Sequence, residues 1–325
     1  MASASATRQL AATGRSDQSA DRSAHSKAKT MKPPQFDYFG PTELSDVLSL
    51  LAGRDRGMKI LAGGQSLVPM LNARSLRPHA LVDINNVSEL SRLSHEPDGL
   101  KVGATIRQRE LERHPGLARI NPLLAETLPL IGHIQTRNRG TVCGSLAHAE
   151  PSAQLPAVAI TQEAKFTIQS KRGQRTVEAQ EFFKDAFTTT VEPDEMLTDV
   201  AFPAWDTRDG WAIEQVSRRP GNFAMAGVMV LFAPANGSGA RVRITVFGNG
   251  DIPRRSESAE ELASSDSLSS SLLDEIVKRV RAEVSTRGEN NATSEYLRHV
   301  TGPLARRALI RAAQRAGVLT EGFNG

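Results

Sequence analysis

The sequence predicts an α+β protein made of two folded parts, and three features of the chain support this. Between residues 41 and 84, segments with helical spacing of apolar residues alternate with short buried strands. From residue 90 to residue 202, short strands separated by turn residues become frequent. After a polar stretch at residues 203–210, three strands precede two long helices. A length of 325 residues with 39% hydrophobic composition is enough for two domains and a sizeable core.

The first part is expected to begin with a helix over residues 41–51, for which Thr42 is the N-cap candidate. A strand at residues 58–61 then leads through a glycine loop into a helix that ends near Ala73. A buried strand at residues 81–84 completes this small layered unit. The elements expected next are a strand (100–106), two helices (109–113 and 121–132), a buried helix (153–160), a hairpin (165–170 with 175–178) and a strand (196–202).

The polar segment at residues 203–210 is the best candidate for a domain boundary. Beyond it, the sequence predicts three antiparallel strands at residues 211–218, 223–232 and 241–247. Two amphipathic helices follow at residues 271–284 and 294–316, after a loop at residues 264–271.

Charge and cysteine content exclude several classes of function. The formal net charge is +4, but residues 1–30 account for +3 with five basic and two acidic residues, so no basic nucleic-acid footprint is visible in the remainder. The single cysteine, Cys143, excludes an internal disulfide and cannot build an iron–sulfur cluster, which needs several thiolates. There is no run of eighteen apolar residues, so no membrane span is predicted.

Residues 1–30 are expected to be a disordered extension, or the product of an over-long gene start. They are rich in Ala, Ser and Arg, with neither an apolar export-signal core nor a twin arginine, although they slightly resemble an organellar transit peptide. The structured pattern opens at Met31.

A two-glycine loop at residues 60–70, ILAGGQSLVPM, is the first candidate site. Glycines at a strand-to-helix junction permit positive φ and leave no side chain in the way, so successive backbone N–H groups can point at one anion. The helix N-terminus adds partial positive charge at the same point. This pattern fits a diphosphate cradle, and it also fits a tight strand-to-helix connection without a ligand.

A second loop of the same character, RGTVCGSLAH at residues 139–148, favours the ligand-binding interpretation. Two small-residue loops about 75 residues apart suit a long cofactor with a diphosphate in its middle. The chain contains neither G-x-G-x-x-G after a strand nor G-x-x-x-x-G-K-[ST], which disfavours a nicotinamide Rossmann site and an NTPase.

Together, AGGQSLVPMLNAR (62–74) and RNRGTVCGSLAHAEPSAQLPA (137–157) resemble the two flavin-binding signatures of the FAD-binding medium subunits of molybdenum hydroxylases, relatives of carbon monoxide dehydrogenase and xanthine dehydrogenase. The likeness runs from about Met31 to the C-terminus and includes residues 218–224 and 296–299. It implies a vanillyl-alcohol-oxidase (PCMH) type of FAD-binding domain at residues 31–208, with subdomains at about 31–86 and 87–208. A C-terminal domain with a three-stranded antiparallel sheet and helices would occupy residues 209–325.

The resemblance also implies which residues hold FAD. The backbone of the first loop would bind the diphosphate, the second loop would close on it, and residues 131–132 would line the flavin side. Lys59 either faces the cofactor or is a solvated strand residue. The full implied set is Lys59, Leu61, Ala62, Gly63, Gly64, Gln65, Ser66, Leu67, Ile131, Gly132, Thr141, Gly144 and Ser145.

The chain departs from the family pattern at four positions. Cys143 replaces one of two adjacent glycines, and its thiol either lies near the flavin or packs as a small buried residue. Glu150 and Asn222 each stand where an Asp is usual and keep a hydrogen-bond acceptor, while Ile213 falls where some members carry a tyrosine near the isoalloxazine.

No metal site and no catalytic residue of the chain itself are predicted. His133, Cys143 and His148 lie close in sequence but lack regular ligand spacing. No Ser/His/Asp or paired-carboxylate arrangement stands out, so the non-covalently bound flavin would carry the chemistry, and the protein would bind and orient it.

The function implied by the resemblance is electron relay in the cytoplasm. A large subunit with a molybdenum cofactor would hydroxylate a substrate, a small subunit with 2Fe–2S clusters would pass the electrons on, and this chain's FAD would deliver them to an external acceptor. The complex would be a dimer of heterotrimers. The alternatives are a free-standing flavin oxidase and a non-catalytic FAD-binding assembly protein. Neither the substrate (an N-heterocycle, an aldehyde or carbon monoxide) nor the acceptor (NAD, oxygen, a quinone or another carrier) follows from the sequence.

Overall fold

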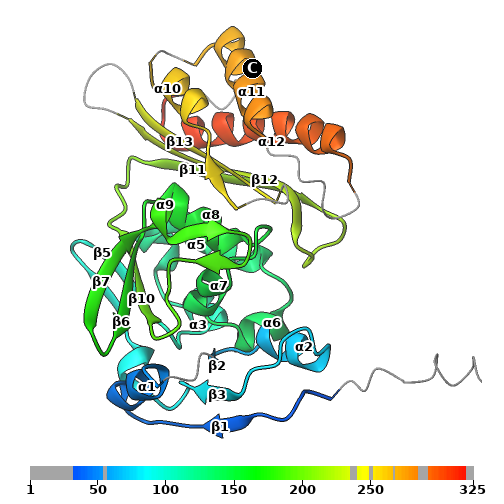
Figure 1. Cartoon of the computed structure of the whole chain (residues 1–325). Coiled ribbons are helices and arrows are strands. Elements are labelled where there is room, and N and C mark those ends of the chain that lie inside the picture. Colours follow the sequence, from blue (N-terminus) through cyan, green and yellow to red (C-terminus); the bar gives the residue numbers. More distant parts are fainter. Residues whose placement is uncertain are drawn as a thin grey trace, which may run out of the picture.

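The computed structural model describes residues 32–53, 57–234, 240–248, 252–265, 268–284 and 292–319, so the expectation for residues 1–30 lies outside the described residues. The described chain stacks in three layers (Figure 1). A small sheet lies at the N-terminal end, a five-stranded sheet with most of the helices lies in the middle, and an antiparallel sheet covered by three helices lies at the C-terminal end. The predicted α+β fold class is confirmed.

The small sheet is parallel, because each pair of successive strands is joined by a helix. Its strands β1 (Asp37–Phe39), β3 (Ala80–Asp83) and β2 (Met58–Leu61) lie in that order, with the helices α1 (Leu44–Leu51) and α2 (Leu67–Asn72) in the connections. Thr42 is not the N-cap of α1. The helix starts at Leu44, whose N–H donates to the Glu89 carboxylate at 2.9 Å, a partner supplied from 45 residues away.

The middle sheet is antiparallel, and its strands were largely predicted. In spatial order they are β4 (Leu93–Glu96), β5 (Gly99–Gly103), β10 (Met196–Pro203), β6 (Lys165–Ser170) and β7 (Gly173–Glu178). Smaller elements of this layer are η1 (Ser88–Ser91), β8 (Phe183–Asp185), β9 (Thr188–Thr189) and α9 (Ala179–Phe182).

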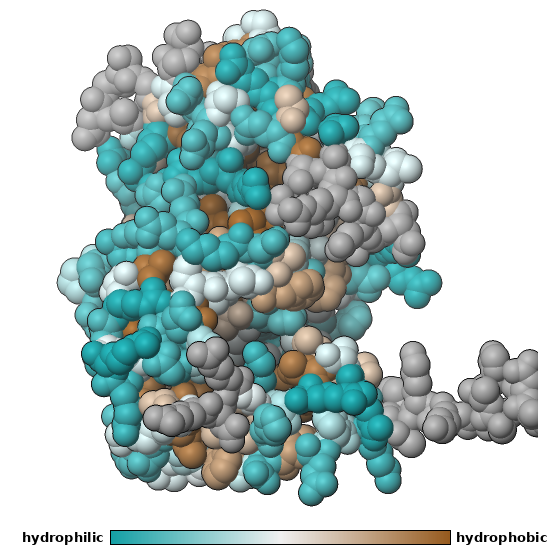
Figure 2. Space-filling view, viewed as in Figure 1, coloured by the Kyte–Doolittle hydropathy of each residue, from teal (hydrophilic) through white to brown (hydrophobic). Residues whose placement is uncertain are grey.

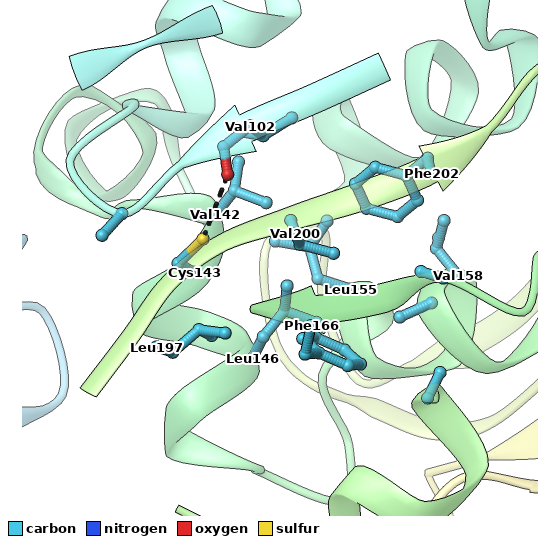
Figure 3. Packing of buried hydrophobic residues seen from close by; sticks show 14 of the residues in the cluster. Val102, Val142, Cys143, Leu146, Leu155, Val158, Phe166, Leu197, Val200 and Phe202 are labelled. Atoms are coloured by element: carbon cyan, nitrogen blue, oxygen red, sulfur yellow. Dashed lines mark hydrogen bonds between the residues drawn. The ribbon is translucent and has the colours of Figure 1, made fainter. Parts of the chain in front are cut away.

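Helices pack against this sheet, and the apolar core of the middle layer lies between them. They are α3 (Gln108–Glu112), α4 (Leu117–Ile120), α5 (Pro122–Thr127), η2 (Leu128–Leu130), α6 (Ile134–Arg139), α7 (Val142–His148) and α8 (Gln154–Thr161). All eight residues of α8 are buried, and side chains of α7 and α8 pack with those of β5, β6 and β10 in one apolar cluster (Figure 3). The single helix predicted over residues 121–132 is split into α5 and η2 at Pro129, which has no N–H to continue the helical ladder.

The C-terminal layer contains the three predicted strands and one more. Its strands are β11 (Gly210–Ser217), β12 (Ala224–Pro234), β13 (Ala240–Phe247) and the two-residue β14 (Arg254–Arg255), so the sheet has four strands rather than three. Its helices are α10 (Glu257–Ser265), α11 (Ser270–Glu283) and α12 (Ser294–Arg315), of which α10 was not predicted.

The C-terminal sheet has apolar residues on both faces. One face, with Val228, Val230 and Ile244, packs against α10–α12. The other contributes Met229 and Phe247 to the core of the middle layer, where α8 contacts β12 and β13. On the face seen in Figure 2, hydrophilic residues dominate the outer surface, and hydrophobic residues are visible in several places, including the junction of these two layers. No helix among the described residues is long and apolar enough to span a membrane.

Candidate functional site

The two glycine loops, far apart in sequence, touch each other through their backbones. A Cβ atom placed on Gly63 would lie 2.4 Å from the carbonyl oxygen of Arg139 and 2.7 Å from the Cα of Gly140. Atoms that close would overlap, so only glycine permits this approach. The loop after β2 therefore lies directly against the segment that joins α6 to α7.

The first loop presents a run of unused backbone donors. Gly64 has φ of 71°, in the left-handed region, and its carbonyl accepts the N–H of Val68 at 3.0 Å as α2 begins. Within the described part of the chain, the N–H groups of Gly63, Gly64, Gln65 and Ser66 have no protein hydrogen-bond partner. Four successive free donors around a positive-φ glycine form a concavity suited to an anion such as a diphosphate.

The second loop is organised by Thr141, which caps α7. Its hydroxyl accepts the N–H of Gly144 at 3.0 Å, and its carbonyl accepts the N–H of Ser145 at 3.2 Å. A Cβ on Gly144 would lie 2.5 Å from that hydroxyl oxygen, which explains the glycine. The N–H groups of Gly144 and Ser145 are therefore already used, because both donate to Thr141. Among the described residues, the N–H groups of this loop that have no protein partner are those of Thr141 and Cys143.

A polar network that the sequence analysis missed lies beside both loops. Arg107 donates to the Arg139 carbonyl at 2.8 Å and to the Asn85 side-chain oxygen at 2.5 Å, and Asn85 donates to the Ala62 carbonyl at 3.0 Å. Asp83, at the end of β3, accepts the N–H of Asn85 at 2.9 Å. Burial and the neighbouring Arg139 lower the pKa of Arg107 from its ordinary value. The one sequence signal for this network was that Asp83 and Asn85 lie at the carboxyl end of a predicted strand, where ligand-binding residues of parallel sheets are often found.

A second arginine holds the segment expected to line the flavin side. Arg137 of α6 donates to the Ile131 carbonyl at 2.9 Å, and it pairs with both carboxylate oxygens of Glu112 in α3, at 2.8 and 3.2 Å. Gly132, with φ of 50°, forms the turn. Burial opposes ionisation of Glu112, but hydrogen bonds from Arg137 and Arg109 outweigh it and lower the pKa of this carboxyl below its ordinary value.

The C-terminal layer reaches the same region through the turn between β11 and β12. A Cβ on Gly221 would lie 2.5 Å from the His133 ring, so this turn packs against the residue just before α6. Phe223, in the same turn, is exposed. Ile213 instead lies in the core with 4% of its surface exposed. Lys59 is exposed on β2.

Cys143 belongs to the apolar core. Its side chain is 2% exposed, and the thiol donates to the Val102 carbonyl at 3.4 Å (Figure 3). Burial and the carboxylate of Asp199 raise the pKa of the thiol far above its usual range. Of the two interpretations of this cysteine, the structure supports the small buried residue. Among the described residues, no three His, Cys, Asp or Glu side chains gather in a way that could hold a metal ion.

Comparison with known proteins gives two family matches that together span most of the chain. Residues 34–205 match the FAD binding domain in molybdopterin dehydrogenase, and residues 211–312 match the CO dehydrogenase flavoprotein C-terminal domain. Caffeine dehydrogenase subunit beta of Pseudomonas sp. (strain CBB1) is 34% identical over 286 residues, covering 88% of this chain and 97% of that protein.

Solved structures of two relatives have the same fold. Carbon monoxide dehydrogenase from Hydrogenophaga pseudoflava superposes with a TM-score of 0.84 at 31% identity, covering 87% of this chain and 99% of that chain. Quinoline 2-oxidoreductase from Pseudomonas putida 86 gives a TM-score of 0.82 at 30% identity, covering 88% and 99%.

Proposed function

Because this chain belongs to the FAD-binding medium subunits of molybdenum hydroxylases, we propose that it holds FAD between its two glycine loops and relays electrons in a multi-subunit complex. The chain is thus a flavoprotein subunit of an oxidoreductase. The observation that best supports the location of the site is the run of four unpartnered N–H groups at residues 63–66, against which the second loop is packed.

The proposed site consists of the first loop, the second loop and the turn before α6. The backbone of residues 62–66 would hold the diphosphate, and the N–H groups of Thr141 and Cys143 would face it from the second loop. Arg137 would fix the turn on the flavin side. The full proposed set is Lys59, Leu61, Ala62, Gly63, Gly64, Gln65, Ser66, Leu67, Ile131, Gly132, Thr141, Gly144 and Ser145.

Bound FAD can accept electrons singly and release them singly or as a pair, which suits a step between iron–sulfur clusters and an acceptor. In the proposed complex, the partners are a large molybdenum-binding subunit and a small 2Fe–2S subunit, arranged as a dimer of heterotrimers in the cytoplasm. Carbon monoxide dehydrogenase medium chains among the relatives support the large and small partners. The proposed division of the chain is an extension (1–30), an FAD-binding domain (31–208, with subdomains at about 31–86 and 87–208) and a C-terminal domain (209–325).

The proposal is tested with the full-length chain purified alone and then mixed with its two partner subunits. Alone, it should carry one FAD that acid precipitation releases, with neither iron nor molybdenum. It should show no anaerobic bleaching of the flavin with N-heterocycles, aldehydes or carbon monoxide, and the partners should restore bleaching by the complex's own substrate. Bleaching by an organic substrate in the absence of partners would instead establish a free-standing oxidase. Bound FAD that stays oxidised in the active complex would indicate an assembly role.

A further inference from the structure

The two loops are in contact, yet within the described residues no hydrogen bond joins one loop directly to the other. The first loop follows β2 of the small parallel sheet, and the second joins α6 to α7 in the middle layer. Contact between Gly63 and the Arg139 carbonyl is a steric fit, which limits how close the loops come but does not hold them together. Any hydrogen-bonded connection between the two loops therefore runs through side chains outside them.

Arg107 and Asn85 supply that connection. Arg107 donates to the carbonyl oxygen of Arg139, the atom that stands nearest to Gly63. Its other terminal nitrogen donates to Asn85, which in turn donates to the carbonyl of Ala62, the residue before Gly63. One Arg–Asn pair therefore binds a carbonyl on each side of the loop contact.

This connection also has an electrostatic effect on the cradle. A carbonyl oxygen that faced a diphosphate would repel it, whereas a backbone N–H attracts it. The pair draws the Ala62 and Arg139 carbonyls onto side-chain donors, so these two oxygens are engaged while the N–H groups of residues 63–66 stay free. The planar guanidinium suits this role because its N–H groups can bind two acceptors at a fixed angle.

We propose that Arg107, acting through Asn85, is a positioning residue that sets the spacing of the two loops and thereby determines how tightly the diphosphate cofactor is held. This inference rests on the proposed function, since it assumes that FAD lies between the loops. Arg107 would act by binding the loop carbonyls and not by contact with the reacting part of the flavin.

The test compares FAD binding to the full-length, FAD-free chain by fluorescence quenching for wild type, Arg107→Gln, Arg107→Lys and Asn85→Leu. Arg107→Gln and Asn85→Leu should each weaken FAD binding by about 10- to 100-fold, the effect of losing a hydrogen bond to a charged group. Arg107→Lys should be intermediate, because an ammonium keeps the charge but lacks the two-acceptor fork. Arg113→Gln, an exposed arginine at the end of the same helix, is the matched control and should bind like wild type.

Thermal unfolding of the same proteins without and with FAD separates positioning from a general loss of fold. If Arg107 positions the loops, the melting increase caused by saturating FAD shrinks in Arg107→Gln and is partly restored in Arg107→Lys. The double variant with Asn85→Leu should be little worse than either single one, because both act through one connection. Binding within twofold of wild type in both Arg107→Gln and Asn85→Leu, or an equal loss in Arg113→Gln, would overturn the inference. A wild-type chain that binds no FAD would overturn the proposed function as well.

Discussion

At the scale of single residues, the first loop needs its two glycines for different reasons. At Gly63 the restriction is space, because a Cβ would collide with the backbone of the second loop. At Gly64 it is conformation, because φ is 71°, while the nearest atoms to a Cβ are side-chain carbons of Val68 and Leu61 at 3.2 and 3.3 Å. A substitution at Gly64 is therefore the more informative one, because it does not force the loops apart.

We expect Gly64→Val to give a folded protein that has lost its flavin. Positive φ costs a branched residue about 1–2 kcal/mol, and the added side chain would crowd Val68 and Leu61 at the turn that presents the free N–H groups. Gly116→Val is the matched control, since Gly116 has φ of 83° and open space around its Cβ position. Both variants should unfold at a lower temperature than wild type when free of FAD, but only Gly64→Val should lack the flavin absorbance. A yellow Gly64→Val protein with one FAD per chain would remove this loop from the site.

The sequence could predict these glycines because their signal is local, whereas the arginines of the site carry no such signal. Arg107 meets Asn85 from 22 residues away and the Arg139 carbonyl from 32 residues away. Arg137 meets Glu112 from 25 residues away. No periodicity connects such positions, so only the folded chain reveals which of its many arginines serve the site.

At the scale of elements, two helix predictions were wrong or missing, because the start of one helix depends on a distant residue and the apolar pattern of the other is weak. The start of α1 is set by Glu89, 45 residues away, and not by a local cap. Helix α10 was missed because its buried stripe includes Ala259 and Ala263, two small residues with little hydrophobic contrast. Strongly apolar elements such as β2 and α8 were predicted within a residue or two of their observed bounds.

The pairing of α3 with α6 leads to a prediction about stability. Glu112→Gln would leave the guanidinium of Arg137 buried without its carboxylate, so we expect the free energy of unfolding at pH 7 to fall by about 3 kcal/mol. Because Arg137 also holds the Ile131 carbonyl, FAD affinity should fall as well. Chemical denaturation and FAD titration measure the two effects. Unchanged stability would show that the ion pair contributes nothing net.

The same variant should change the pH dependence of stability. The pKa of Glu112 is lowered in the folded protein, so its contribution is complete above the ordinary value of 4.5 and is lost as the pH falls through the lower folded value. Wild type should therefore lose stability more steeply than Glu112→Gln below pH 4.5. Parallel curves for the two proteins in that range would contradict this assignment.

At the scale of the whole molecule, the C-terminal layer is joined to the rest by polar contacts as well as by the shared core. Glu126 of α5 accepts from the Trp211 ring nitrogen at 2.9 Å and from Arg315 at 2.6 Å, and it also pairs with Arg311. A second link joins Glu163, after α8, to Arg243 and Arg255 of the C-terminal sheet. The sequence gave no sign of these links, because each joins residues at least 80 positions apart.

We expect Glu126→Gln to lower the free energy of unfolding by about 1–2 kcal/mol, because one carboxylate there serves three partners in a partly buried setting. Glu178→Gln is the control, since Glu178 pairs with Lys165 on an open surface and should change stability by less than about 0.5 kcal/mol. Urea unfolding followed by tryptophan fluorescence measures both, because Trp211 lies at the junction. Equal effects of the two substitutions would show that the Glu126 cluster does not couple the layers.

The contact between Gly63 and the Arg139 carbonyl also bears on the order in which the protein is made and loaded. During translation the first loop leaves the ribosome about 75 residues before the second, and Met229 and Phe247, which complete the shared core, follow much later. A growing chain therefore carries only one of the two loops while about 75 further residues are added. We expect FAD to bind only after both loops and these core residues have been synthesised, and not to a nascent chain that carries the first loop alone.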